Sequence, residues 1–110
     1  MFARHVSIKL KANSAAEFKR IIENEVVPLL RKQKGFRDEI TFIAPERSEA
    51  VGNSLWDTKE DAQAYNSTGY PEVLKALSKV VEGTPTVETF EVATSTLHKL
   101  ASAAKAGVIN

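Results

Sequence analysis

The chain has 110 residues, of which 43% are hydrophobic and 26% charged, and its formal net charge is +1 at pH 7. This size and composition predict one soluble globular domain, and the small net charge argues against a nucleic-acid-binding protein that depends on a basic face. The absence of cysteine excludes disulfides, thiolate metal sites and cysteine nucleophiles. No apolar stretch approaches the ~20 residues of a membrane span, and the first residues do not resemble a signal peptide, so we expect no membrane association and a cytoplasmic location.

The first expected element is a strand over residues 2–10, in which side chains alternate between two faces. One face carries Phe2, Val6, Ile8 and Leu10, and the other carries Ala3, His5, Ser7 and Lys9. This alternation is typical of a strand with one buried face. Arg4 falls in the register opposite to that of His5, so we expect it near the sheet edge or on the side covered by helices.

Apolar residues at helical spacing predict a helix over residues 15–33, whose start Asn13 or Ser14 can cap. Pro28 lies inside this helix. Because proline has no N–H and crowds the carbonyl four residues earlier, we expect a kink there or a break near Val27.

Two further strands are expected over residues 37–44 and 49–56, joined by a polar turn. Thr58 is followed three residues later by Asp61, an arrangement like a capping box. It predicts the start of a short helix over residues 59–66.

Pro71 suits the first turn of another helix, whose apolar stripe ends at Gly83. A final strand is expected over residues 86–93, and the Ala/Ser/Lys-rich residues 94–110 predict a tail or weak helix. The order β-α-β-β-α-β, with an extra short helix, predicts an α+β fold of the ferredoxin-like split βαβ type, with an antiparallel sheet covered by helices on one side.

The uncovered face of this sheet is expected to be partly apolar. The strands carry apolar residues on both faces, as the neighbouring Phe42 and Ile43 illustrate. Such a face would expose a large apolar patch in water. We therefore expect it to be buried against a second copy of the chain.

Several short segments resemble those of a known family. They are Val26-Val27-Pro28-Leu29-Leu30, Lys34-Gly35-Phe36-Arg37-Asp38, Ser54-Leu55-Trp56-Asp57 and Glu60-Asp61-Ala62. Through them, residues 2–93 resemble the antibiotic biosynthesis monooxygenase (ABM)-like family of the dimeric α/β-barrel superfamily. The resemblance implies a domain over residues 1–93, a homodimer whose sheets form a barrel, and a pocket between sheet and helices. The family includes cofactor-independent monooxygenases of phenols and quinols, haem-degrading enzymes and proteins without a known activity.

Cofactor-free oxygenation needs a bound phenol, a hydrogen-bonding group and a base. The candidates for a catalytic site are Asn53, Trp56, Tyr65 and His5, since Asn53 and Tyr65 can bind a phenolate, Trp56 offers an aromatic wall and His5 can act as a base. The alternative interpretation is that Trp56 packs the edge of the core and that His5 forms a hydrogen bond across the dimer. Tyr70 also lies near this region, where packing is its simpler role.

Other chemistries find less support. Haem degradation would need a histidine in the helix over residues 71–82, which has none, and Tyr65 stands where the family's haem-degrading members have a pocket tryptophan. The sequence has no metal-binding histidine pair and no nucleotide-binding glycine motif, so we expect no metal and no cofactor. The resemblance to the ABM-like family thus implies a cofactor-independent monooxygenase of a small aromatic phenol or quinol. The alternative is a non-catalytic dimeric-barrel protein that binds a small hydrophobic ligand or acts in a stress response.

Overall fold

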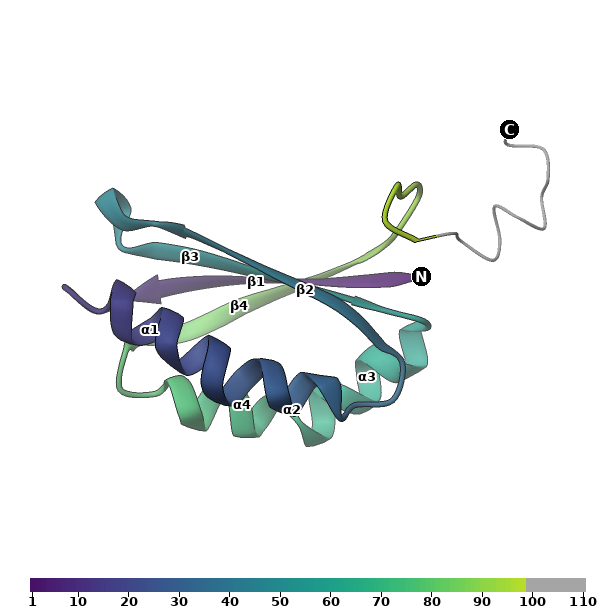
Figure 1. The fold of residues 1–110 in the computed structure, drawn as a ribbon, viewed down its shortest axis with the longest axis horizontal. Coiled ribbons are helices and arrows are strands. Elements are labelled where there is room, and N and C mark those ends of the chain that lie inside the picture. Colours follow the sequence, from purple (N-terminus) through teal and green to yellow (C-terminus); the bar gives the residue numbers. More distant parts are fainter. Residues whose placement is uncertain (99–110) are drawn as a thin grey trace.

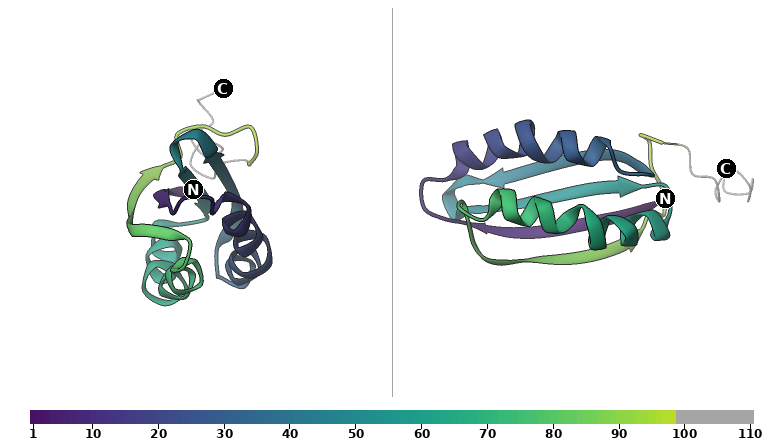
Figure 2. Two further views of the ribbon diagram at one scale, coloured as in Figure 1. Left: turned by 90° about the vertical axis from the view of Figure 1, so that its left-hand side faces the viewer. Right: turned by 90° about the horizontal axis from the view of Figure 1, so that it is seen from below.

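The computed structural model describes residues 1–98, which form a four-stranded antiparallel sheet with helices on one face (Figure 1). The strand order is β2-β3-β1-β4, and the strands are β1 (Phe2–Leu10), β2 (Phe36–Ala44), β3 (Glu49–Trp56) and β4 (Val81–Glu91). The helices lie side by side on one face of the sheet as two rods that run in opposite chain directions (Figure 2). The predicted α+β ferredoxin-like fold is confirmed.

The first rod contains an irregular turn just before Pro28. It consists of α1 (Ala15–Ile21), a π-helical turn η1 (Ile22–Val26) and α2 (Val27–Arg31). The wider π-helical turn gives room for a residue that lacks an N–H and would crowd the preceding carbonyl. The predicted irregularity is confirmed, and it takes the form of a π-helical turn rather than a break in the chain direction.

The second rod is formed by α3 (Lys59–Thr68) and α4 (Tyr70–Leu77). The predicted cap of α3 is confirmed, because the Thr58 hydroxyl accepts a hydrogen bond from the backbone N–H of Asp61 at 3.0 Å. Ser14, by contrast, makes no side-chain cap hydrogen bond at the start of α1.

The prediction that α4 extends to Gly83 and that the last strand begins at residue 86 is wrong. The helix ends at Leu77 and β4 begins at Val81. Val80 and Val81 are both buried, and the apolar sequence around them suits a helix as well as a strand. Gly83 lies inside β4 with φ +70°, where the pairing of β1 with β4 shifts register between Ser7 and Lys9.

The segment after β4 returns toward the start of β2. Residues 92–98 form neither helix nor strand, and the His98 imidazole contacts the Asp38 carboxylate. The remainder of the predicted tail or weak helix, residues 99–110, lies outside the described part of the chain.

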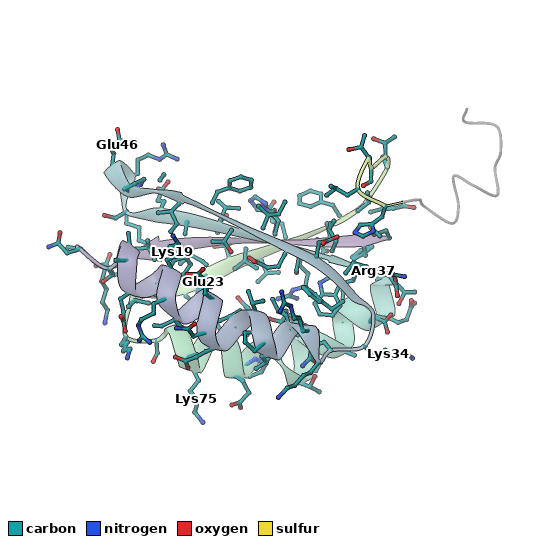
Figure 3. All side chains as sticks on the ribbon, viewed as in Figure 1. Lys19, Glu23, Lys34, Arg37, Glu46 and Lys75 are labelled. Atoms are coloured by element: carbon teal, nitrogen blue, oxygen red, sulfur yellow. The ribbon has the colours of Figure 1, made fainter. Side chains whose placement is uncertain are left out.

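The two faces of the sheet differ in character. The side facing the helices carries the buried side chains of the core, among them Ile8, Leu10, Ala50 and Trp56. On the other side, called here the open face, Ile40, Phe42 and Phe90 are 46%, 61% and 51% exposed. Charged side chains such as Lys34, Glu46 and Lys75 extend outward at the periphery of the molecule (Figure 3). None of the helices in residues 1–98 is long and apolar enough to cross a membrane.

Candidate functional site

A cavity of about 60 Å³ lies between the sheet and the two helical rods. Its walls come from all four strands and from η1, α2, α3 and α4, and most of them are aliphatic, for example Ile8, Val26 and Leu77. The polar or aromatic side chains among its lining residues come from three strands and two helices, and include Arg4, Glu39, Thr41, Tyr65 and Tyr70. An apolar pocket with a few polar groups is the usual form of a small-molecule site.

Arg4 is the charged group most deeply buried at this cavity, with only 2% of the residue exposed. Its Nη1 donates a hydrogen bond of 2.9 Å to Oδ1 of Asn66 on α3. Within residues 1–98, its Nε and Nη2 have no hydrogen-bond partner, and no carboxylate forms an ion pair with it. Burial lowers the pKa of Arg4 from its ordinary value, but a guanidinium stays protonated in proteins. The cavity wall therefore holds an uncompensated positive charge.

Two tyrosines hold the Arg4 guanidinium in place. Its central carbon lies 4.5 Å from the centre of the Tyr70 ring and 5.1 Å from that of Tyr65. Both distances are typical of cation–π contacts, which strengthen when the cation is removed from water. Burial raises the pKa of both tyrosines, and the Arg4 charge opposes part of this shift. Both phenols are consequently neutral hydrogen-bond donors, and the Tyr70 hydroxyl has no partner in the described part of the chain.

Trp56 stands behind Tyr65 and outside the cavity wall. It is fully buried, and its indole N–H donates a 2.9 Å hydrogen bond to Oγ of Ser54. Its ring stacks on Tyr65 with a centroid distance of 4.8 Å and an interplanar angle of 27°, and it contacts Phe36 edge-on. Since its one polar hydrogen is already bonded, Trp56 is placed to position Tyr65 rather than to contact a ligand.

Glu39 of β2 is the carboxylate at the cavity. Burial raises its pKa above the ordinary value, and a hydrogen bond donated by the Thr41 hydroxyl opposes part of that shift. A carboxylate with a raised pKa is a stronger base than an exposed one. Its carboxylate can thus accept a proton from a group in the cavity.

His5 and Asn53 lie together, but on the open face of the sheet. They are directly paired residues of β1 and β3, and His5 Nδ1 is 2.8 Å from Asn53 Oδ1. His5 also contacts Phe90 edge-on at a centroid distance of 6.4 Å. Asn53 borders the cavity as well, although its side-chain oxygen is engaged by His5. The sequence-derived candidates therefore separate into Trp56 with Tyr65 beneath the sheet and His5 with Asn53 above it.

Arg4 and Glu39 were not among the predicted catalytic candidates. The signal for Arg4 was its register, because a charged residue shares the strand face of Ile8 and Leu10. Glu39 gave no such signal, since its place at the cavity depends on a register shift between Phe36 and Asp38 at the start of β2. Among residues 1–98, no group of three or more His, Asp and Glu side chains is arranged to hold a metal ion.

Comparison with known proteins gives matches at the level of structure. No protein-family model and no curated protein sequence matches the chain. A Bordetella bronchiseptica protein classed as an antibiotic biosynthesis monooxygenase superposes with a TM-score of 0.73 at 16% identity, covering 84% of this chain and 97% of that one. SnoaB, a cofactor-independent oxygenase from Streptomyces nogalater, gives 0.70 at 13% identity, covering 88% and 97%. A monooxygenase from the gene ActVA-Orf6 of Streptomyces coelicolor, in complex with nanaomycin D, gives 0.72 at 14% identity, covering 89% and 92%.

These superpositions cover most of every chain compared, so the fold is shared. The resemblance found in the sequence is confirmed in this respect. Sequence identities of 13% to 16% carry the fold and leave the activity to be argued from the site itself.

Proposed function

From the fold that this chain shares with the antibiotic biosynthesis monooxygenases, we propose that it is a cofactor-independent monooxygenase of a small aromatic phenol or quinol. The observation that carries the proposal is the buried Arg4 guanidinium, in which two nitrogen atoms have no hydrogen-bond partner within residues 1–98 and which lies beside the aromatic rings of Tyr65 and Tyr70. A buried cation of this kind favours the phenolate over the phenol. The similar fold of SnoaB, described as a cofactor-independent oxygenase, supports the same reading.

The proposed reaction needs no external reductant. A phenol loses its proton, and the phenolate passes one electron to O₂, which gives an aryloxyl radical and superoxide. These combine to form a C–O bond at a ring carbon that carries hydrogen. Cleavage of the O–O bond with loss of that hydrogen leaves a quinone carbonyl, and the second oxygen atom leaves as water. The substrate thus supplies all the electrons that reduce O₂.

In this scheme each polar group at the cavity has one task. Glu39 accepts the phenolic proton, and Arg4 stabilises the phenolate during electron transfer. Tyr65 and Tyr70 hold the guanidinium and border the substrate ring, while Trp56 acts as a positioning residue through its stack on Tyr65. We assign His5 and Asn53, which lie on the open face, to the contact between two copies of the chain rather than to the chemical step.

The size of the cavity limits the substrate. A closed apolar cavity of about 150 Å³ holds benzene, whereas this one measures about 60 Å³. A single aromatic ring would therefore need some side chains to move, and a polycyclic one would need many. Ile22 and Val26 of the π-helical turn line the cavity, and such turns are frequent at functional sites.

Oxygen consumption tests the proposal. Purified protein treated with a chelator should consume O₂ faster than the spontaneous rate with at least one member of a panel of monocyclic phenols and hydroquinones. Arg4→Met and Glu39→Gln should slow this uptake, while His5→Gln should change it little at protein concentrations where the dimer persists. Uptake that is lost on chelation would contradict a cofactor-free reaction.

The small cavity also supports the second candidate function, a non-catalytic protein that binds a small hydrophobic ligand. That function predicts that phenols raise the unfolding temperature without any O₂ uptake. Haem turnover would require an iron ligand, yet no histidine lines the described cavity. A hemin titration without a shift of the Soret band would exclude it.

We also propose that the open face forms a homodimer. Ile40, Phe42 and Phe90 expose large apolar side chains there, and burying them against a second copy would remove them from water. Light scattering at micromolar concentration should give twice the 12.1 kDa mass of one chain. The monomer mass would exclude this assembly.

A further inference from the structure

The hydrogen bonds of Arg4 leave one side of its guanidinium free. Nη1 is engaged by Asn66 on α3, whereas Nε and Nη2 have no partner within residues 1–98. In arginine, Nε–H and one terminal N–H point in parallel from the same edge of the planar group. This edge forms two parallel hydrogen bonds with a pair of neighbouring oxygen atoms in one plane.

No described residue pairs with the Nε and Nη2 edge of Arg4 or neutralises its charge through an ion pair. Arg4 takes part in no ion pair among the described residues, and the faces of Tyr65 and Tyr70 lie against its guanidinium. A buried charge with unpaired donors is costly, and a ligand that pairs both donors recovers that cost on binding. A ligand with a single oxygen would have to share it between the two parallel donors in bent, weaker hydrogen bonds.

The flanking rings restrict the shape of the ligand. The Arg4 guanidinium packs on Tyr70 and Tyr65, and the cavity volume is about 60 Å³. Two neighbouring oxygens in the plane of a single aromatic ring match the buried Nε and Nη2 edge, and side chains around the cavity must move to admit the ring. Oxygens at opposite ends of a ring cannot reach one guanidinium edge together.

We propose that the substrate is a 1,2-dioxygenated aromatic ring, of the catechol class, whose monoanion binds with both oxygens on the Nε and Nη2 edge of Arg4. This inference rests on the proposed function, because it specifies the substrate of that same cavity. The reaction remains balanced. One molecule of such a substrate and one of O₂ give a hydroxyquinone, in which a ring C–H has become C=O, and one molecule of water.

Two chromophoric probes distinguish the effect of a second oxygen on binding affinity from the effect of the negative charge. Both 4-nitrocatechol and 4-nitrophenol ionise near neutral pH, and their nitro groups make them poor electron donors, so binding is measured without oxidation. They differ by one oxygen next to the first. We expect the wild-type protein to bind 4-nitrocatechol about tenfold more tightly, as one further hydrogen bond to a charged group implies. Equal affinities for the two probes would overturn the inference.

Arginine-to-lysine variants supply the matched control. Arg4→Lys keeps the charge and loses the parallel pair of donors, so the preference for 4-nitrocatechol should fall below about threefold while the affinity for 4-nitrophenol changes little. Arg37→Lys makes the same change at an exposed arginine paired with Asp57, and should keep the full preference. A preference that survives in Arg4→Lys would overturn the assignment to this side chain.

A measurement on the wild-type protein serves if Arg4→Lys does not fold. The ¹H–¹⁵N signal of the Arg4 Nε–H group should shift on addition of 4-nitrocatechol and shift much less with 4-nitrophenol. An unmoved signal at saturating 4-nitrocatechol would overturn the inference. The O₂-uptake assay remains independent, because uptake with simple phenols and no preference for 4-nitrocatechol would retain the proposed function and reject the catechol class.

Discussion

The guanidinium carbon of Arg4 lies 4.5 Å from the centre of the Tyr70 ring, at the inner wall of an apolar cavity. Arg4 belongs to an interior strand and Tyr70 to the start of a helix, so this contact joins the sheet to the second helical rod. A charge in this position reduces the favourable burial of apolar surface around it. A ligand that pairs with Arg4 Nε and Nη2 would offset this cost on binding.

Arg4→Met should separate stability from function. Methionine fills a similar volume without a charge, and replacing a buried ionic group by an apolar one is often neutral or stabilising. We expect the unfolding temperature to stay the same or rise, while the affinity for 4-nitrocatechol falls by at least about tenfold. Calorimetric unfolding and absorbance titration measure the two effects. A destabilisation like that of the core truncation Ile8→Ala, about 2–5 kcal/mol, would show instead that Arg4 is mainly structural.

Ser54→Ala should destabilise the protein through Trp56. The substitution removes the acceptor of the buried indole N–H and leaves that donor unsatisfied, at a cost of about 1–3 kcal/mol. Trp56 is the only tryptophan in the sequence, so its fluorescence reports the change directly. In the background of Trp56→Phe, which has no indole N–H, Ser54→Ala should cost clearly less. Equal costs in the two backgrounds would show that the hydrogen bond contributes nothing.

Glu39→Gln should change the pH dependence of stability. Burial raises the pKa of Glu39 above its ordinary value of 4.5 in the folded protein, so the folded state binds the proton more tightly than the unfolded state. The stability associated with this group is complete below pH 4.5 and is lost as pH rises through the raised folded value. We therefore expect Glu39→Gln to be more stable relative to wild type at pH 7 than at pH 4, as measured by denaturant unfolding.

Glu17 provides a control of opposite sign for the pH experiment. A hydrogen bond from Arg20 lowers the pKa of Glu17 from 4.5 to about 2 on the surface of α1. Its contribution is present above pH 4.5 and is lost as pH falls toward the lowered value. The small loss of stability caused by Glu17→Gln at neutral pH should therefore disappear in acid. The same sign for both variants would contradict the burial of Glu39 in the folded protein.

Gly35→Ala should be more damaging than Gly83→Ala. Both glycines have positive φ, +80° and +70°, so an alanine at either position carries a backbone cost of about 1–2 kcal/mol. At Gly35 the new methyl group would also lie 2.7 Å from Cβ of Asp61, whereas at Gly83 no atom of the described residues outside its chain neighbours lies within 4 Å. Denaturant unfolding of the two variants measures the difference. Equal losses of stability in the two variants would show that α3 can shift at Asp61 without a measurable cost.

Much of the fold follows from sequence patterns that act locally. The strict alternation in β1 and the Thr58 cap were sufficient to place those elements, because each depends on residues close together in the chain. The start of β4 was misplaced, since Val80 and Val81 suit either a helix or a strand. The choice between them is made by the pairing of Val81 with Leu10, which lies far away in the sequence.

The candidate site was harder to predict for the same reason. Tyr65 was recognisable from the short helix, but the cavity also depends on which strand face each residue takes. Asn53 was a candidate for the ligand site, and His5 was a candidate for that site or for a hydrogen bond across the dimer; the strand register places the hydrogen bond between them on the open face. Glu39 reaches the cavity only because β2 shifts register after Phe36. Single-residue shifts of this kind reverse the face of a side chain and are not visible in composition or spacing.

The adjacency of Arg4 and His5 in β1 links the two sides of the sheet. Arg4 borders the cavity and His5 lies on the open face, so one peptide bond connects the proposed ligand contact with the surface proposed for a second copy. A ligand that draws β1 toward the helices would also draw His5 away from that surface. Ligand binding and dimerisation would then be coupled. By thermodynamic reciprocity, the factor by which ligand changes the dimerisation constant equals the factor by which dimerisation changes the affinity for ligand, so dilution of the protein would alter that affinity.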